Sequence, residues 1–82
     1  MLMCGEYMLS IDGIGSIDTV IKSLLVIRRS RLKFRSVEAT TNGYGVKIKI
    51  RINGLDDEAS WIARKIESIA SIASVQLLKG DC

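Results

Sequence analysis

The chain has 82 residues, of which 48% are hydrophobic and 26% charged, and it carries a formal net charge of +3 with neither histidine nor proline. This length excludes several domains, so we take residues 1–82 as one domain with an ordered core over about residues 6–78. Its apolar runs are too short to cross a membrane, and its mild basicity permits an anionic partner without requiring one, since nucleic-acid-binding domains usually cluster more charge.

The first elements in the chain are a strand and a helix. A strand is predicted from Glu6 to Asp12, where Tyr7, Leu9 and Ile11 alternate with Met8, Ser10 and Asp12. Gly13-Ile14-Gly15 predicts a loop after this strand. From Ser16 to about Arg29 the apolar residues recur at helical spacing, in a stripe of Ile17, Val20, Leu24 and Ile27. Ser16 or Asp18 can cap the first turn of that helix.

The clearest strand runs from Val46 to Ile52 and alternates strictly between β-branched and cationic residues. Because a strand turns successive side chains to opposite faces, this segment has a core face and a solvent face. The core face carries Val46, Ile48, Ile50 and Ile52. The solvent face carries Lys47, Lys49 and Arg51. The sheet is therefore expected to be covered on one side only.

A further strand, from Leu32 to about Thr41, leads into Asn42-Gly43, a strong hairpin signal because both residues tolerate a positive φ. Placing Asn42-Gly43 at the two central turn positions pairs Ala39 with Val46, Glu38 with Lys47 and Val37 with Ile48. The same register puts Phe34 opposite Arg51. We therefore predict a β-bulge near Arg35-Ser36, which returns Phe34 to the core face.

The last part of the chain predicts a second helix and a fourth strand. Asn53-Gly54 closes the third strand, and Asp56 or Asp57 caps the helix. The helix stripe is Ala59, Ile62, Ile66 and Ile69, flanked by Trp61, with Arg64, Lys65 and Glu67 outside. The final strand spans Ile72 to Leu78, with Val75 and Leu77 inward, and residues 79–82 form a short, loosely held tail. The order is βαββαβ, an α+β ferredoxin-like fold with two helices on one face of a four-stranded antiparallel sheet.

Residues able to carry catalysis are sparse. The chain lacks histidine, and its acids lie on turns and helix starts, so no acid–base or nucleophilic set is visible and no enzymatic activity is expected. Cys4 and Cys82 lie near the two ends, outside any metal-ligand spacing, and no secretory leader is present. We therefore expect no metal, no cofactor and a cytoplasmic location.

Two stretches are candidates for binding. Gly13-x-Gly15 before a helix can bring backbone amides close to an anion, although Asp18 stands where a dinucleotide fingerprint has its third glycine and repels phosphate. This stretch is either a tight strand-to-helix turn or a loop that receives the carboxylate of a small amino acid. The row of Lys47, Lys49 and Arg51 is either a solvated strand face or a surface for an anionic partner. Nucleic acid is the weaker of those partners, because the row has no aromatic residue on which bases could stack.

The segment from Asp18 to Ala39 resembles the first helix and second strand of ACT domains. It is most similar to the small regulatory subunits of acetolactate synthase (acetohydroxyacid synthase), whose helix ends in an Ile/Val-x-Arg-Arg-Gly-Phe pattern. The segment from Trp61 through Leu78 is similar to the family's second helix and last strand. The chain departs from the family pattern in lacking a Pro-Gly pair in the first loop and in carrying Arg31-Leu-Lys-Phe34 where the family has Gly-Phe-Asn-Ile.

The resemblance implies a non-catalytic regulatory subunit or amino-acid-sensing module in branched-chain amino-acid biosynthesis. It implies a homodimer paired through sheet edges, a large catalytic enzyme subunit as partner, and a small amino-acid effector between the first loop of one chain and the second strand of the other. Carried onto this sequence, the ligand-binding residues are Asp12, Gly13, Ile14, Gly15, Ser16, Lys33 and Phe34. The alternative function is a small nucleic-acid-binding domain that uses Lys47, Lys49 and Arg51.

Overall fold

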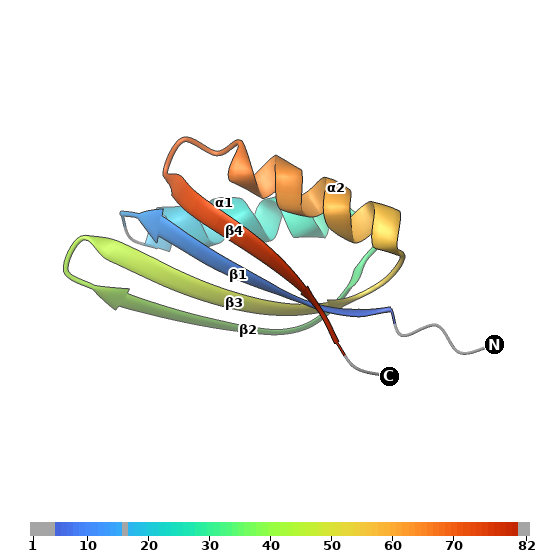
Figure 1. Cartoon of the computed structure of the whole chain (residues 1–82). Helices are drawn as coiled ribbons and strands as arrows, with labels where there is room; N and C mark the ends of the chain where they lie inside the picture. Colours follow the sequence, from blue (N-terminus) through green and yellow to red (C-terminus); the bar gives the residue numbers. More distant parts are fainter. Residues whose placement is uncertain (1–4, 16, 81–82) are drawn as a thin grey trace.

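Four strands and two helices follow one another in the predicted βαββαβ order in the computed structural model, which describes residues 5–15 and 17–80 (Figure 1). The elements are β1 (Glu6–Ile14), α1 (Ile17–Arg28), β2 (Lys33–Asn42), β3 (Gly45–Asn53), α2 (Asp56–Glu67) and β4 (Ile72–Lys79). The strands form one antiparallel sheet in the order β2-β3-β1-β4. The predicted ferredoxin-like fold is confirmed.

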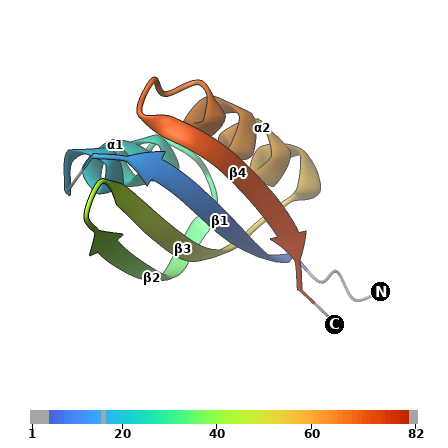
Figure 2. The same cartoon turned by 60° about the vertical axis from the view of Figure 1, so that its left-hand side comes forward.

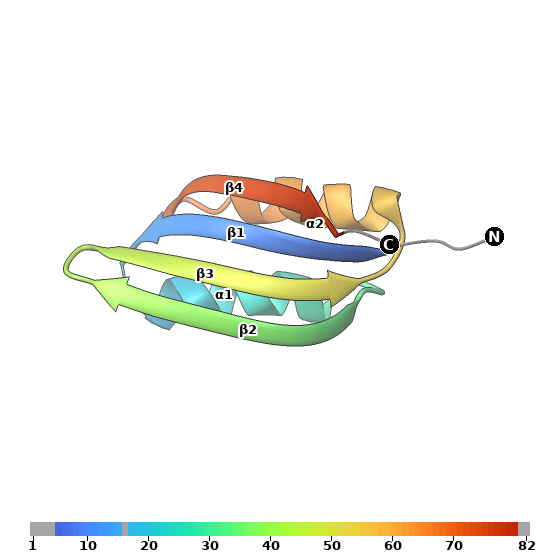
Figure 3. The ribbon, with the colours of Figure 1, turned by 60° about the horizontal axis from the view of Figure 1, so that its bottom comes forward.

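Both helices lie on the same side of the sheet, and the other side, the open face, carries no helix (Figures 1 and 3). Helix α2 packs mainly on β4, while α1 contacts α2 and β3. Strand β2 lies at the edge farthest from α2 (Figure 2), and all ten of its residues are exposed. One edge strand of this sheet is therefore left uncovered.

The core lies between the helices and the two central strands. Its fully buried centre includes Leu9, Ile11, Ile48, Ile50, Ile52, Ile62 and Ile66. In β3 the alternation is as predicted: Val46, Ile48, Ile50 and Ile52 are buried and the three cations between them are exposed. The period-two pattern of β3 thus assigns each of its side chains to a face of the sheet.

The hairpin register differs from the prediction by two residues. Ala39 lies opposite Ile48 rather than Val46, because the central turn positions are Gly43 and Tyr44 rather than Asn42 and Gly43. Only Gly43 in this turn has a positive φ, at 62°, which is the pattern of a type II′ turn with glycine at the first central position. The predicted turn needed a positive φ at Asn42 as well, and no described residue other than glycine has one.

The predicted β-bulge is confirmed at Arg35. The β2–β3 register shifts between Phe34 and Ser36, so that Phe34 lies opposite the buried Ile52. A register error of two residues leaves every side chain on its face, whereas a shift of one reverses them all. The bulge was therefore predictable from the mismatch of faces even though the paired residues were not.

The predicted apolar stripe of helix α1 is confirmed at Ile27, Val20 and Leu24 but not at Ile17, and two polar residues are buried beside it. Thr19, Ser23 and Ile27 are its buried residues, Val20 and Leu24 are partly buried, and Ile17 is 66% exposed. The Ser23 hydroxyl donates to the carbonyl of Thr19 at 3.0 Å, so this buried polar group is satisfied within the helix. The Ser23 and Thr19 hydroxyls can both be buried on this side of α1, because each donates a hydrogen bond to a backbone carbonyl. Of the two predicted helix-capping residues, Asp18 lies inside the first turn of α1 and Ser16 lies outside the described residues.

Helix α2 begins without the predicted side-chain cap. Leu55 is its N-cap residue and makes no side-chain cap hydrogen bond, while Asp56 and Asp57 lie inside the first turn, where their charge favours the positive end of the helix dipole. Ala59, Ile62 and Ile66 are buried as predicted, and the partly buried Ile69 follows the end of the helix.

The predicted tail begins too early. Lys79 is the last residue of β4, and its Nζ lies 3.6 Å from the Asp56 carboxylate. The Gly80 N–H donates to the Glu6 carbonyl at 2.7 Å. Asp81 and Cys82, like Cys4 at the other end, lie outside the described residues.

Candidate functional site

The junction between β1 and α1 holds most of the predicted ligand-binding residues. Strand β1 extends through Gly13 and Ile14, two residues beyond the predicted end, so Asp12, Gly13 and Ile14 are strand residues and not loop residues. They lie opposite Lys47, Val46 and Gly45 of β3. The turn itself is made at Gly15, whose φ of 111° suits glycine.

Hydrogen bonds hold this junction to two other parts of the chain. The Thr19 hydroxyl donates to the Ile14 carbonyl at 2.9 Å and lies 3.2 Å from the Ser71 Oγ. The Ile14 N–H donates to the Ser71 carbonyl at 2.7 Å, and the Gly15 N–H donates to the Tyr44 carbonyl at 3.0 Å. The amides of Ile14 and Gly15 are thus already satisfied, and a ligand carboxylate at this junction must find other donors.

Gly13 is packed closely enough that an added Cβ would have to displace its neighbours by a few tenths of an ångström. A Cβ on this residue would lie 3.0 Å from the Ser71 carbonyl oxygen and 3.1 Å from the Thr19 Cγ2. We expect Gly13→Ala to lower the free energy of unfolding by about 1–3 kcal/mol in urea titration, because the hydrogen bonds just described hold both neighbours in place. Gly45→Ala is the matched control: its Cβ meets nothing closer than 3.5 Å, and it should change stability by less than about 0.5 kcal/mol. Equal losses in the two variants would contradict the packing argument.

The other two predicted ligand-binding residues lie at the opposite end of the sheet. Gly13 is level with Val46 of β3, whereas Phe34 is level with Ile52, six residues further along that strand. At roughly 3.3 Å per residue this separation is about 20 Å. A single chain therefore does not bring Lys33 and Phe34 together with the β1–α1 junction.

A groove between α1 and β2 escaped the sequence reasoning. Its volume is about 420 Å³, and we call it the α1–β2 groove; it is lined by Ile21, Leu24, Leu25, Ile27, Arg28, Leu32 and Phe34. Ile21 and Leu25 are 47% and 43% exposed, although neither belongs to the predicted helix stripe. The sequence did contain a signal for this groove: Ile21 and Leu25 are four residues apart and lie beside the stripe of Leu24 and Ile27. Helix α1 is therefore apolar over more of its circumference than one packed face requires.

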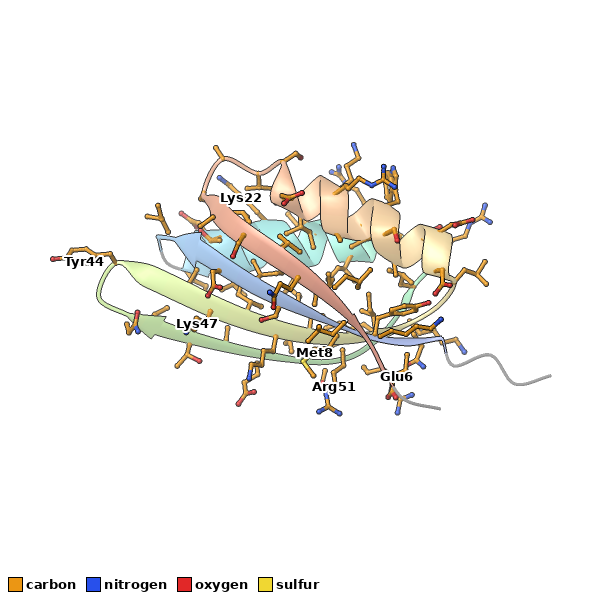
Figure 4. The ribbon with its side chains drawn as sticks, viewed as in Figure 1. Glu6, Met8, Lys22, Tyr44, Lys47 and Arg51 are labelled. Atoms are coloured by element: carbon orange, nitrogen blue, oxygen red, sulfur yellow. The ribbon has the colours of Figure 1, made fainter. Side chains whose placement is uncertain are left out.

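The cationic row lies on the open face, as predicted. Lys47, Lys49 and Arg51 are exposed there, and Figure 4 shows Lys47 and Arg51 projecting from this side together with Met8 and Glu6. Asp12 is opposite Lys47 and Glu38 is opposite Lys49, so acids neighbour two of the three cations. A shallow hollow of about 200 Å³ beside Arg51, Met8 and Leu78 completes this face.

Aromatic side chains of the described residues lie away from the cationic row. Tyr44 is at the hairpin tip, Phe34 is on the helix side of β2, Trp61 is on α2, and Tyr7 is buried. The open face over residues 5–15 and 17–80 thus offers hydroxyls and mixed charges but no stacking platform for bases.

The same described residues offer neither a metal-binding cluster nor a helix that could span a membrane. Within them, no group of three or more Cys, Asp or Glu side chains is placed to hold a metal ion. No helix of the described chain is long and apolar enough to span a bilayer. Cys4 and Cys82 fall outside this part of the chain.

Comparisons with known proteins identify the fold. No protein-family model matches the sequence, and no curated protein matches it. Among solved structures, the ACT domain of GTP pyrophosphokinase from Chlorobium tepidum superposes with a TM-score of 0.80 at 14% identity, over 89% of this chain and 96% of that one. The chain has the ferredoxin-like fold of ACT domains.

Two further structures share this fold. A homoserine dehydrogenase from Thiobacillus denitrificans superposes with a TM-score of 0.77 at 14% identity, over 92% of this chain but only 17% of the enzyme. The C-terminal domain of the MgtC protein from Mycobacterium tuberculosis gives 0.77 at 7% identity, over 98% of this chain and 94% of that domain. Because one fold serves unrelated functions, function must be argued from the site.

Proposed function

We propose that the chain is a non-catalytic regulatory module of the ACT type that works as a side-by-side homodimer. The observation that carries the proposal is the uncovered edge of the sheet: β2 is exposed along its whole length, and the apolar α1–β2 groove runs beside it. The likeness of fold to an ACT domain that forms part of GTP pyrophosphokinase supports the regulatory reading.

The uncovered edge is an unusual surface for an isolated domain. An edge strand presents unpaired backbone groups, and natural proteins protect such edges or pair them. Here the edge is flanked by four half-exposed apolar side chains: Ile21, Leu25, Phe34 and Val37 are 40–49% exposed. A contiguous apolar patch of this kind marks an interaction surface. Pairing β2 with β2 of a second copy joins two four-stranded sheets into one and covers the patch.

The same pairing supplies a place for an effector. In an antiparallel β2–β2 pair, the beginning of one β2 lies near the end of the other. Lys33 and Phe34 of one chain then approach the hairpin tip and the β1–α1 junction of its partner, from which they are about 20 Å away within one chain. We propose that a small amino acid binds between these two elements, and that the binding-competent unit is the dimer.

The finer assignment rests on the sequence likeness of residues 18–39 and 61–78 to small subunits of acetolactate synthase. On this proposal the effector is a branched-chain amino acid and the regulated partner is a large catalytic subunit. The open face of the sheet, with Lys47, Lys49 and Arg51, stays available to an acidic surface of that subunit.

A thermal-shift screen against the twenty amino acids tests the sensing role. We expect valine, leucine or isoleucine at millimolar concentration to raise the melting temperature, because a ligand that binds only the folded state stabilises it by RT ln(1 + [L]/Kd), about 2.7 kcal/mol at one hundred times Kd. Sedimentation under the same conditions gives the oligomeric state. A flat response to all twenty would refute the sensing role while leaving a subunit role, and a monomer at micromolar concentration would refute the dimer.

A further inference from the structure

We infer that two copies pair through β2 in one register, with Ala39 on the two-fold axis, and that Tyr44 of each copy docks in the α1–β2 groove of the other. This inference rests on the proposed dimer and adds to it the paired residues and the aromatic anchor. It follows from the bulge in β2, the charge at Glu38 and the exposure of Tyr44.

The bulge at Arg35 limits which part of β2 can pair regularly. The extra residue reverses the alternation of faces along β2. Phe34 points to the helix side, whereas the even-numbered residues after the bulge, from Ser36 to Asn42, point to the open face. The Arg35 guanidinium donates to the Asn53 Oδ1 at 3.2 Å, which ties the bulge to β3. A regular ladder with a second copy is thus confined to the seven residues from Ser36 to Asn42.

Symmetry then leaves few registers. In a two-fold antiparallel pair, the axis must pass through a residue, which then lies opposite the same residue of the other copy. An axis between two residues is excluded, because it would pair side chains of the open face with side chains of the helix side. An axis at Val37 draws the bulge into the ladder. An axis at Glu38 opposes two carboxylates, which is destabilising. An axis at Thr40 shortens the ladder to five residues.

An axis at Ala39 avoids all three penalties. It pairs the whole segment from Ser36 to Asn42 with its copy. Glu38 then lies opposite the partner's Thr40, and Val37 lies opposite the partner's Thr41. The charged residue meets a hydroxyl on the open face, and the apolar residue stays on the helix side. This register is the longest one that the bulge and the charges permit.

The Ala39 register also accounts for Tyr44, which is 91% exposed at the hairpin tip and points away from the body of the molecule (Figure 4). With Asn42 of one copy opposite Ser36 of the other, the hairpin turn of Gly43 and Tyr44 lies at the level of the partner's Arg35 and Phe34 along the strand. Phe34 lines the α1–β2 groove, whose lining is apolar except for the Arg28 side chain. A tyrosine ring suits such a groove, because the ring buries apolar area and its π-face attracts a guanidinium.

Disulfide trapping between two different variants reads the register directly. In a background with Cys4 and Cys82 replaced by serine, Glu38→Cys and Thr40→Cys chains are prepared, oxidised separately and as a mixture, and analysed by non-reducing electrophoresis and mass spectrometry. Directly opposed residues have Cα atoms about 4.5–5.5 Å apart, within disulfide reach, whereas an offset of two residues gives about 8 Å and excludes the bond.

The Ala39 register predicts a covalent dimer of E38C with T40C in the mixture and none in either variant alone. A T40C homodimer would place the axis at Thr40, and an E38C homodimer would place it at Glu38; either overturns the register while leaving the β2-paired dimer of the proposed function intact. A dimer in sedimentation that no combination traps would overturn the Ala39 register and exclude the axes at Glu38 and Thr40 as well. A monomer in sedimentation would refute both the register and the dimer.

Tyr44→Ala tests the anchor separately. We expect the dissociation constant of the dimer, from sedimentation equilibrium, to rise at least about tenfold, as for a buried aromatic anchor. Because Tyr44 is so exposed within one chain, the variant should keep the circular dichroism of the parent. Trp61→Ala is the matched control: Trp61 is a half-exposed aromatic on α2, away from the groove, and its loss should leave the constant unchanged. An unchanged constant in Y44A would refute the docking of Tyr44.

Discussion

A Val37→Lys chain is expected to fold normally and to sediment as a monomer at concentrations where the parent is a dimer. Val37 is 40% exposed on the helix side of β2, so within one chain a lysine there reaches water. In the proposed dimer the same ammonium would be buried against the partner's β2 without a counter-charge. Lysines on edge strands are a device by which natural proteins prevent such pairing. A cost of about 3 kcal/mol or more weakens the dimer by over a hundredfold.

Leu78→Lys is the control for this experiment, since Leu78 is half-exposed on β4, the other edge strand. It should sediment as the parent does. A dimeric V37K protein together with a monomeric L78K protein would place the interface at β4 instead of β2. We also expect V37K to lose any stabilisation by an amino-acid effector, because in the proposed dimer the two elements that bind the effector come from different chains.

An Ile50→Ala chain is expected to lose about 2–5 kcal/mol of its free energy of unfolding, the range for truncating a fully buried isoleucine. Ile50 has 0% exposure and lies on β3 between Leu9 of β1 and Val37 of β2, under the helices. Small domains have a total stability of about 5–15 kcal/mol, so this loss is a large share of it. Urea unfolding followed by circular dichroism measures the change, at fixed protein concentration because the stability of the proposed dimer depends on concentration.

Lys49→Ala is the neighbouring control on the other face of the same strand. Its side chain is exposed, so the change should stay within about 0.5 kcal/mol. A loss in K49A as large as that in I50A would mean that the open face is covered by something other than solvent, and the assignment of faces in β3 would need revision.

Several features of the fold were predictable because they depend on side-chain periodicity alone. Val46 to Ile52 alternates without exception, so the face of every residue in β3 follows from its number. The bulge at Arg35 follows from the same parity, since Phe34 is otherwise on the wrong side. The order βαββαβ was predictable for the same reason, because it requires only that each segment be correctly assigned as a helix or a strand.

Features that depend on competition between neighbours were not predictable. Asn42-Gly43 and Gly43-Tyr44 both make acceptable turns, and only the packed sheet selects the second. The buried side of α1 is set by where the helix lies on the sheet, which favours Thr19 and Ser23 over Ile17. Leu55 rather than Asp56 precedes α2 for a similar reason: the chain leaving β3 decides where the helix begins.

The candidate site divides in the same way. The residues near Gly13 and the residues Lys33 and Phe34 could be named from the sequence, because glycine positions and family likeness are local properties. Tertiary structure placed them about 20 Å apart within one chain, used the Ile14 and Gly15 amides internally, and left β2 beside an open apolar groove. By itself, then, the sequence determined which side chains face the core, since that depends on periodicity along one strand or helix. Only the tertiary structure decided which surface remains unpaired, because exposure depends on what the other elements cover.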